Sequence, residues 1–168
     1  MARSFHSQTT KLFWNPSKIY LLNTLNQNMS ELSIISNDFS DGGEIPKACG
    51  YKHGNEQPHI DFLNMPNEPG QWAMIMDDPD AMKAVGKVWV HWLEYGKTDD
   101  SVTEGKNDFG EIGYGGPAPP DGQHTYIFKL YALDADLDLK EGFSKQELED
   151  AMKGHILAEA KLTGTFAP

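Results

Sequence analysis

The sequence predicts a mainly β protein, an antiparallel β-sandwich with a peripheral helix near its C-terminus. Two observations indicate this fold class. Short apolar segments with strand periodicity alternate with turn-forming residues over most of the chain, whereas helical periodicity is confined to one late segment. A chain of 168 residues is long enough for one domain with a substantial hydrophobic core. Strands followed by a late helix favour an antiparallel sandwich.

The expected strands follow one another with turn-rich segments between them. Residues 71–76 and 87–93 are apolar on both alternating faces, as inner strands are. The period of two places His91 on the same face as Trp89 and Leu93. Residues 96–110 are polar and are expected to form a long surface loop. The strands expected from this pattern cover residues 31–36, 59–63, 71–76, 87–93, 127–134 and 162–166.

One helix is expected after Ser144. Ser144 and Glu147 have the spacing of a capping box, and Phe143 and Leu148 stand at the staple positions around it. Gly154 is expected to kink or divide this helix at a cost of about 1 kcal/mol relative to alanine. The apolar and aromatic positions with helical spacing are Leu148, Ala151, Met152, His155 and Ile156.

Charge divides the chain into two parts. Arg3, Lys11 and Lys18 account for three of the 14 basic residues, so residues 29–168 hold 11 bases and all 25 acids, a net charge of −14. Such a surface repels phosphate backbones, so nucleic acid and anionic membranes are not expected as partners. No apolar run approaches the length of a membrane span. Any anionic ligand must therefore be captured by a local site.

Residues 1–28 are expected to be a mobile N-terminal extension, with Met29 as the functional start of a domain spanning residues 29–168. The alternative is a transit peptide or a cleaved signal, because the segment is basic and free of acids. The single cysteine, Cys49, excludes an internal disulfide and fits a reducing compartment. A cytoplasmic location is therefore expected.

Three polar clusters stand at the ends of expected strands, and we expect them to contribute to one shared site. They are residues 77–80, His91 with Trp92, and residues 124–126, the last of which follows a Gly- and Pro-rich loop at residues 113–123. Each cluster also has a structural interpretation. Aspartates beside proline are common turn formers, and a lone histidine among large apolar residues is usually a core residue. His124 is more suggestive, since a stiff loop would hold its ring in place.

Enzyme signatures are missing from the sequence. It has no Gly-x-Ser-x-Gly elbow, no phosphate-binding loop of the Gly-x-x-x-x-Gly-Lys type and no His-Glu-x-x-His motif. A metal-dependent hydrolase using Asp78, Asp80, His91 and His124 is an alternative, but no close pair of ligands such as His-x-His supports it. We therefore expect no metal and no cofactor.

The polar clusters resemble the motifs of the phosphatidylethanolamine-binding protein family, in the family's order. The matching segments are Asp78-Pro79-Asp80-Ala81, His91-Trp92 and residues 114–128, and residues 131–134 resemble its bacterial and archaeal, Raf kinase inhibitor-like branch. The resemblance covers residues 31–166. It implies a β-sandwich with a small pocket that binds anions, typically phosphate or a phospholipid headgroup.

The resemblance also implies which residues line that pocket. Histidine N–H groups, a tyrosine hydroxyl and glycine-loop amides can donate to phosphate oxygens, and carboxylates can orient the imidazoles or face an ammonium group. None of these residues is an activated nucleophile, so the resemblance implies binding without catalysis. The expected ligand-binding residues are Asp78, Asp80, His91, Gly116, Pro120, His124 and Tyr126.

The expected function is thus a non-enzymatic binding protein for a small phosphorylated ligand or anion, with a regulatory role left open. The alternative is an inhibitor that docks onto a protease or kinase partner through surface loops, and a homodimer is left open. The chain departs from the family's pattern at Met82 and Thr125 and in residues 57–58 and 96–98. Met82 replaces a common proline, and Thr125 stands where arginine is usual, so the preferred headgroup is not implied by the resemblance.

Overall fold

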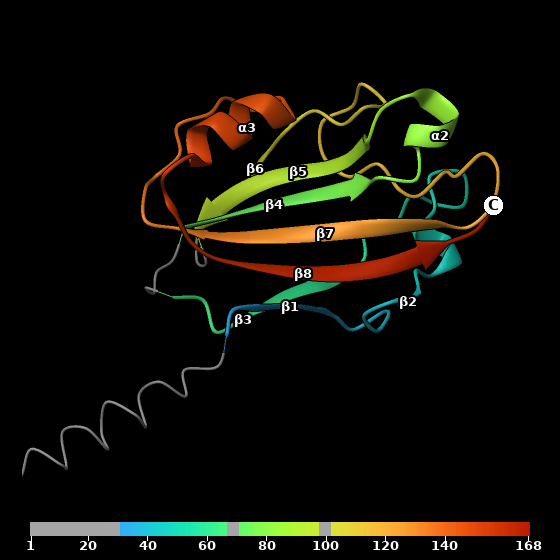
Figure 1. Cartoon of the computed structure of the whole chain (residues 1–168), viewed down its shortest axis with the longest axis horizontal. Coiled ribbons are helices and arrows are strands. Elements are labelled where there is room, and N and C mark those ends of the chain that lie inside the picture. Colours follow the sequence, from blue (N-terminus) through green and yellow to red (C-terminus); the bar gives the residue numbers. More distant parts are fainter. Residues whose placement is uncertain (1–30, 67–70, 98–101) are drawn as a thin grey trace, which may run out of the picture. The chain divides into compact units, whose positions relative to one another are not determined.

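The computed structural model describes residues 31–66, 71–97 and 102–168. The expected N-terminal extension, residues 1–28, lies outside these residues. The described strands form a six-stranded sheet in the order β2-β8-β7-β4-β5-β6 and a two-stranded sheet of β1 and β3 (Figure 1). Hydrogen-bonded neighbours are antiparallel except β2 and β8, which are parallel. The strands are β1 Ser33–Ser36, β2 Gly43–Glu44, β3 Ile60–Leu63, β4 Gln71–Asp78, β5 Trp89–Lys97, β6 Thr103–Glu104, β7 His124–Leu133 and β8 Ile156–Phe166.

The large sheet buries both of its faces. On one face, Met74 and Phe128 pack with Ile34 of the small sheet in a core cluster. On the other face, Ile75 packs with Leu148 of the helix α3, Lys145–Met152. Figure 1 shows β1 and β3 on one side of the large sheet and α3 on the other. The predicted fold class, a β-sandwich with a peripheral C-terminal helix, is therefore confirmed.

The helix α3 begins as predicted and ends earlier. Ser144 Oγ accepts a hydrogen bond from the Glu147 amide (3.3 Å), and Glu147 Oε2 accepts one from the Ser144 amide (2.8 Å), which completes the capping box. The helix ends at Met152, and Gly154 turns the chain with a φ of 84°. The expectations that the helical pattern reaches Ile156 and that the last strand begins at Leu162 were wrong, because β8 already starts at Ile156 and pairs with β7.

A β-bulge lies in β5 at His91. Met76 pairs with Trp92 and Asp77 pairs with Val90, so His91 is an extra residue with no partner in β4. Its ring packs edge-on against Tyr126, with ring centroids 5.1 Å apart, on the face that carries the small sheet. Leu93 lies on the opposite face, in the cluster beneath α3. The expectation that His91 shares a face with Leu93 was therefore wrong, because the bulge interrupts the period of two.

Two short helices and two short strands were not expected. The helices are η1, Lys47–Cys49, and α2, Met82–Val85, which Gly86 ends with a φ of 77°. The strand β6 pairs with β5 inside the segment expected to be a surface loop, while residues 98–101 of that segment lie outside the described residues. None of the helices in the described part of the chain is long and apolar enough to cross a membrane.

Candidate functional site

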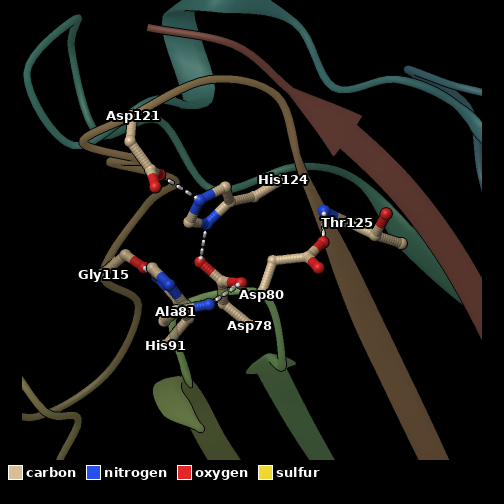
Figure 2. A network of polar contacts seen from close by, with 8 residues as sticks. All are labelled: Asp78, Asp80, Ala81, His91, Gly115, Asp121, His124 and Thr125. Carbon is tan, nitrogen blue, oxygen red and sulfur yellow. Dashed lines mark hydrogen bonds and ion pairs between the residues drawn. The ribbon is translucent and has the colours of Figure 1, made fainter. Parts of the chain in front are cut away.

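The carboxylate of Asp78 connects the end of β4 to the start of β7. Pro79 ends β4, and the chain then turns into α2. Asp78 Oδ1 accepts a hydrogen bond from the Ala81 amide (3.0 Å), and Asp78 Oδ2 lies 2.7 Å from Nδ1 of His124 (Figure 2). The side chain of Asp78 thus stabilises a turn and also pairs with a histidine. The turn-forming interpretation and the interpretation as part of a polar site are therefore compatible.

Both ring nitrogens of His124 face carboxylate oxygens. Nδ1 lies against Asp78, and Nε2 lies 2.9 Å from Oδ1 of Asp121 (Figure 2). A carboxylate only accepts, so each nitrogen carries a hydrogen and the ring is an imidazolium. Burial lowers the pKa of His124, but the hydrogen bonds to the two carboxylates outweigh burial and leave that pKa raised. The positive charge of His124 is therefore stabilised inside the protein, with both of its donors in use.

The second histidine, His91, is oriented by the backbone of the Gly/Pro loop. His91 Nδ1 donates to the Gly115 carbonyl (2.6 Å), and the Gly115 amide donates to the His91 carbonyl (2.8 Å). Burial lowers the pKa of His91, although the contact with Gly115 and the charge of Asp78 oppose this shift. The ring is thus held neutral with its hydrogen on Nδ1, which leaves Nε2 as the nitrogen for a ligand.

The loop itself is held by an asparagine from a distant segment. Asn55 Oδ1 accepts from the Gly116 amide (2.7 Å), and Asn55 Nδ2 donates to the Tyr114 carbonyl (3.3 Å). Gly115, between these two residues, is the one that binds His91. Asn55 therefore fixes the backbone that orients the histidine.

Asp78 and His91 line a cavity of about 180 Å³ where β4 ends and β5 begins. Two of its lining residues, Asp78 and His91, are polar, and both are almost fully buried. The remaining lining is apolar and comes from the α2 segment, from β5 and from the loops, namely Ala81, Ala84, Val85, Trp89, Phe109, Ala118 and Pro120.

The predicted ligand-binding residues divide into two groups by position. Asp78, His91 and Pro120 line the cavity, and His124 pairs with one of them, Asp78. The other three are not among the lining residues. Their ligand-binding roles, like those of the first group, stay predictions. The three are Asp80, whose Oδ2 accepts from the Thr125 amide at 2.9 Å, Gly116, whose amide donates to Asn55, and Tyr126, which is fully buried.

Gly116 and Tyr126 are both buried, in surroundings that the sequence did not reveal. A methyl group on Gly116 would overlap the Cys49 carbonyl and would lie 2.8 Å from the Tyr51 amide, so only glycine fits between the two loops. The Tyr126 hydroxyl has no hydrogen-bond partner among the described residues. Burial therefore raises its pKa far above the ordinary value and keeps it protonated.

Four contributors to the site were not singled out from the sequence, namely three residues and one short helix. Asp121 belongs to the loop motif, but an aspartate between proline and glycine is typical of an ordinary turn. Asn55 and Asn107 lie in polar loops, where only the tertiary contacts distinguish them, and Asn107 Nδ2 donates to the Gly113 carbonyl (3.0 Å). The short helix α2 did have a signal, since helix-forming residues there precede a glycine at the C-terminal capping position.

Metal binding receives no support from the described geometry. Residues 31–66, 71–97 and 102–168 contain no group of three or more His, Cys, Asp and Glu side chains that could hold a metal ion. His91 directs one nitrogen to a carbonyl, and His124 directs both of its nitrogens to carboxylates. The arrangement can instead present Nε2 of His91 to a small molecule in the cavity.

The comparisons with known proteins give a consistent assignment. A family model described as phosphatidylethanolamine-binding protein matches residues 35–167. A UPF0098 protein of Methanothermobacter thermautotrophicus is 38% identical over 151 residues, which is 80% of this chain and 98% of that relative. Both matches include the residues around the cavity.

Solved structures agree with these matches. The putative phosphatidylethanolamine-binding protein homolog CT736 of Chlamydia trachomatis is 35% identical, with a TM-score of 0.73 over 80% of this chain and 96% of that one. YbcL of E. coli, described as a new member of the mammalian PEBP family, is 23% identical and shares the fold, with a TM-score of 0.72 over 82% and 98% of the two chains. The family model covers most of this chain, and the match with the archaeal relative covers 98% of that relative. The chain therefore belongs to the phosphatidylethanolamine-binding protein family.

Proposed function

We propose that this chain is a non-enzymatic binding protein that holds a small anion, a phosphate or a phosphorylated headgroup, in the cavity beside Asp78 and His91. The observation that carries the proposal is the cavity, an apolar recess with two buried polar residues. Pockets for drug-sized ligands usually measure about 300–1,000 Å³, so this cavity suits a single small group.

Two groups support an anionic ligand as hydrogen-bond donors, Nε2 of a protonated His91 and the indole N–H of Trp89. Protonation of His91 would turn Nε2 into a donor, and Nδ1 would keep its contact with Gly115. The indole N–H of Trp89, another lining residue, is buried and has no partner among the described residues. An indole N–H can only donate, so it favours a ligand with acceptor atoms. The carboxylate of Asp78 does not repel such a ligand strongly, because the imidazolium of His124 balances its charge.

Two substitutions at His91 separate its two nitrogens. His91→Asn keeps a donor near the position of Nδ1 and removes Nε2, whereas His91→Gln keeps a donor near Nε2 and removes the contact with Gly115. Isothermal titration with inorganic phosphate and with phosphoethanolamine should show a loss of about 10- to 100-fold for His91→Asn, since a hydrogen bond to a charged group is worth about 1.5–3 kcal/mol. His91→Gln should retain more of the affinity.

The control is His155→Ala, which removes an exposed histidine paired with Asp134 (2.8 Å) far along the chain from the cavity motifs. Its affinity should equal that of the wild type. Failure of the wild-type protein to bind either probe would contradict the proposal, and so would equal binding by His91→Asn. Inhibition of a protease or kinase that persists in His91→Asn would instead support docking through surface loops.

A further inference from the structure

A buried asparagine, Asn107, connects the two loops that hold His91 and complete the cavity wall. Asn107 is 4% exposed, and its side chain makes hydrogen bonds to backbone groups in both loops. We propose that Asn107 is a positioning residue, which acts through Gly115 to keep the hydrogen of His91 on Nδ1 and so leaves Nε2 for the ligand. This inference rests on the proposed function, in which Nε2 of His91 contacts the bound anion.

The oxygen of the Asn107 side chain shapes the loop that contains Phe109. Asn107 Oδ1 accepts hydrogen bonds from the amides of Phe109 (3.0 Å) and Glu111 (3.1 Å), and the Asn107 amide donates to the Glu111 carbonyl (2.8 Å). Bonds from an asparagine to the backbone a few residues on close a tight turn. The Phe109 ring is thereby held in the cavity lining, where it packs edge-on against Trp89 and His91 with ring centroids 5.3 and 5.6 Å away.

The nitrogen of the same side chain reaches the Gly/Pro loop. Asn107 Nδ2 donates to the Gly113 carbonyl (3.0 Å). A methyl group built on Gly115 would lie 2.9 Å from Asn107 Nδ2 and 2.6 Å from Cδ2 of Phe109, so the Gly115 backbone packs directly against both side chains. The Gly115 carbonyl accepts the hydrogen of His91 Nδ1 at 2.6 Å (Figure 2). Asn107 therefore supports the carbonyl that selects the tautomer of His91.

The residue after Asn107 ties this arrangement to β5 beside the bulge. The Asp108 amide donates to the Val90 carbonyl (2.9 Å), and Asp108 Oδ2 accepts from the Val90 amide (2.7 Å). Val90 directly precedes His91, so the backbone of His91 is held independently of the Nδ2 contact. Loss of that contact would loosen the carbonyl of Gly115 and leave the histidine itself in place. The tautomer of His91 is thus the property that reports on Asn107.

The substitution Asn107→Asp separates the two ends of the side chain. Aspartate keeps an acceptor for the amides of its own loop but has no N–H for the Gly113 carbonyl. Asn64→Asp is the matched control, because Asn64 Nδ2 also donates to a backbone carbonyl, that of Glu31 (3.2 Å), at an exposed position outside both loops. Ring ¹⁵N shifts of His91 report its tautomer in the ligand-free proteins, and isothermal titration with inorganic phosphate measures binding.

We expect the wild type and Asn64→Asp to carry the hydrogen of His91 on Nδ1 and to bind phosphate equally. In Asn107→Asp, part of the His91 population should carry it on Nε2 instead. Phosphate should then bind about fivefold more weakly, because binding must also order the ring and its loop. If Asn107→Asp does not fold, Asn107→Ser takes its place, since a serine oxygen still accepts from nearby amides but is too short for the Gly113 carbonyl.

Two outcomes separate this inference from the proposed function. An unchanged His91 tautomer in a folded Asn107 variant would overturn the inference even if phosphate binding fell, because a purely structural role predicts no change of tautomer. Hydrogen on Nε2 in the wild type would overturn it as well. A changed tautomer in Asn107→Asp, in a protein whose wild type does not bind phosphate, would support the positioning of His91 and overturn the proposed function.

Discussion

Glu94→Gln is expected to stabilise the protein at alkaline pH and to have little effect in mild acid. Glu94 lies on β5, is 8% exposed and stands directly opposite Glu104 of β6. Burial raises the pKa of Glu94 to about 8, and the neighbouring charge of Glu104 adds to the shift. Glutamine has the shape of the protonated carboxyl group but cannot ionise.

The magnitude follows from proton linkage. The ordinary pKa of a glutamate is 4.5, so between that value and about 8 the folded protein holds a proton that the unfolded chain has released. Stability of the wild type therefore falls as the pH rises through this window, by about 1.4 kcal/mol for each pH unit. By about pH 8 the loss amounts to about 4 kcal/mol, and Glu94→Gln should not suffer it.

Urea denaturation of both proteins at a series of pH values measures this difference. Contributions from other titrating groups, such as His124, are common to both proteins and cancel in the comparison. Glu104→Gln is the matched control. It removes the smaller cause of the shift and leaves Glu94 buried, so most of the pH dependence should remain. A stability difference between the wild type and Glu94→Gln that stays constant from about pH 5 to about pH 8 would refute the reasoning from burial.

Three further substitutions test other contacts by urea denaturation. Ser144→Ala should cost about 1 kcal/mol, since it removes the N-terminal cap of α3, and an unchanged midpoint would show that the cap is dispensable. Gly116→Ala should cost about 3 kcal/mol, because the added methyl group overlaps the Cys49 carbonyl, and an unchanged midpoint would contradict the close approach of the two loops. Asp77→Asn should cost about 2 kcal/mol, since it weakens contacts with two lysine ammonium groups at 2.6 and 2.8 Å, and a stability difference from the wild type that is equal at low and high salt would contradict an ionic role.

The parts of the fold that were predictable are those with local causes. Every residue of β4 is buried, and the apolar residues on both alternating faces of residues 71–76 predicted this burial. The capping box at Ser144 likewise depends on residues that are neighbours in the sequence. The start of β8 was not predictable in this way. Residues 156–161, Ile-Leu-Ala-Glu-Ala-Lys, favour a helix by propensity, and the ladder with β7 overrides that preference.

The site was predictable in its residue types and less so in its contacts. The motifs pointed to Asp78, His91 and His124, and the structure brings these side chains to one end of the sheet. The β-bulge that places His91 on the face opposite Leu93 was not predictable from the sequence, since neither glycine nor proline stands there. The pairing of Asp121 with His124 depends on how the loop closes, which requires tertiary contacts such as those of Asn55.

The charges around the cavity limit how any anion can bind. The lining of the described cavity contains neither Lys nor Arg, and the chain as a whole has a net charge of −11. The imidazolium of His124 is already matched by carboxylates, and His91 is held neutral. An incoming anion therefore needs a new positive charge or the removal of a negative one. In the proposed function, protonation of His91 supplies the positive charge, so anion binding would be coupled to proton uptake.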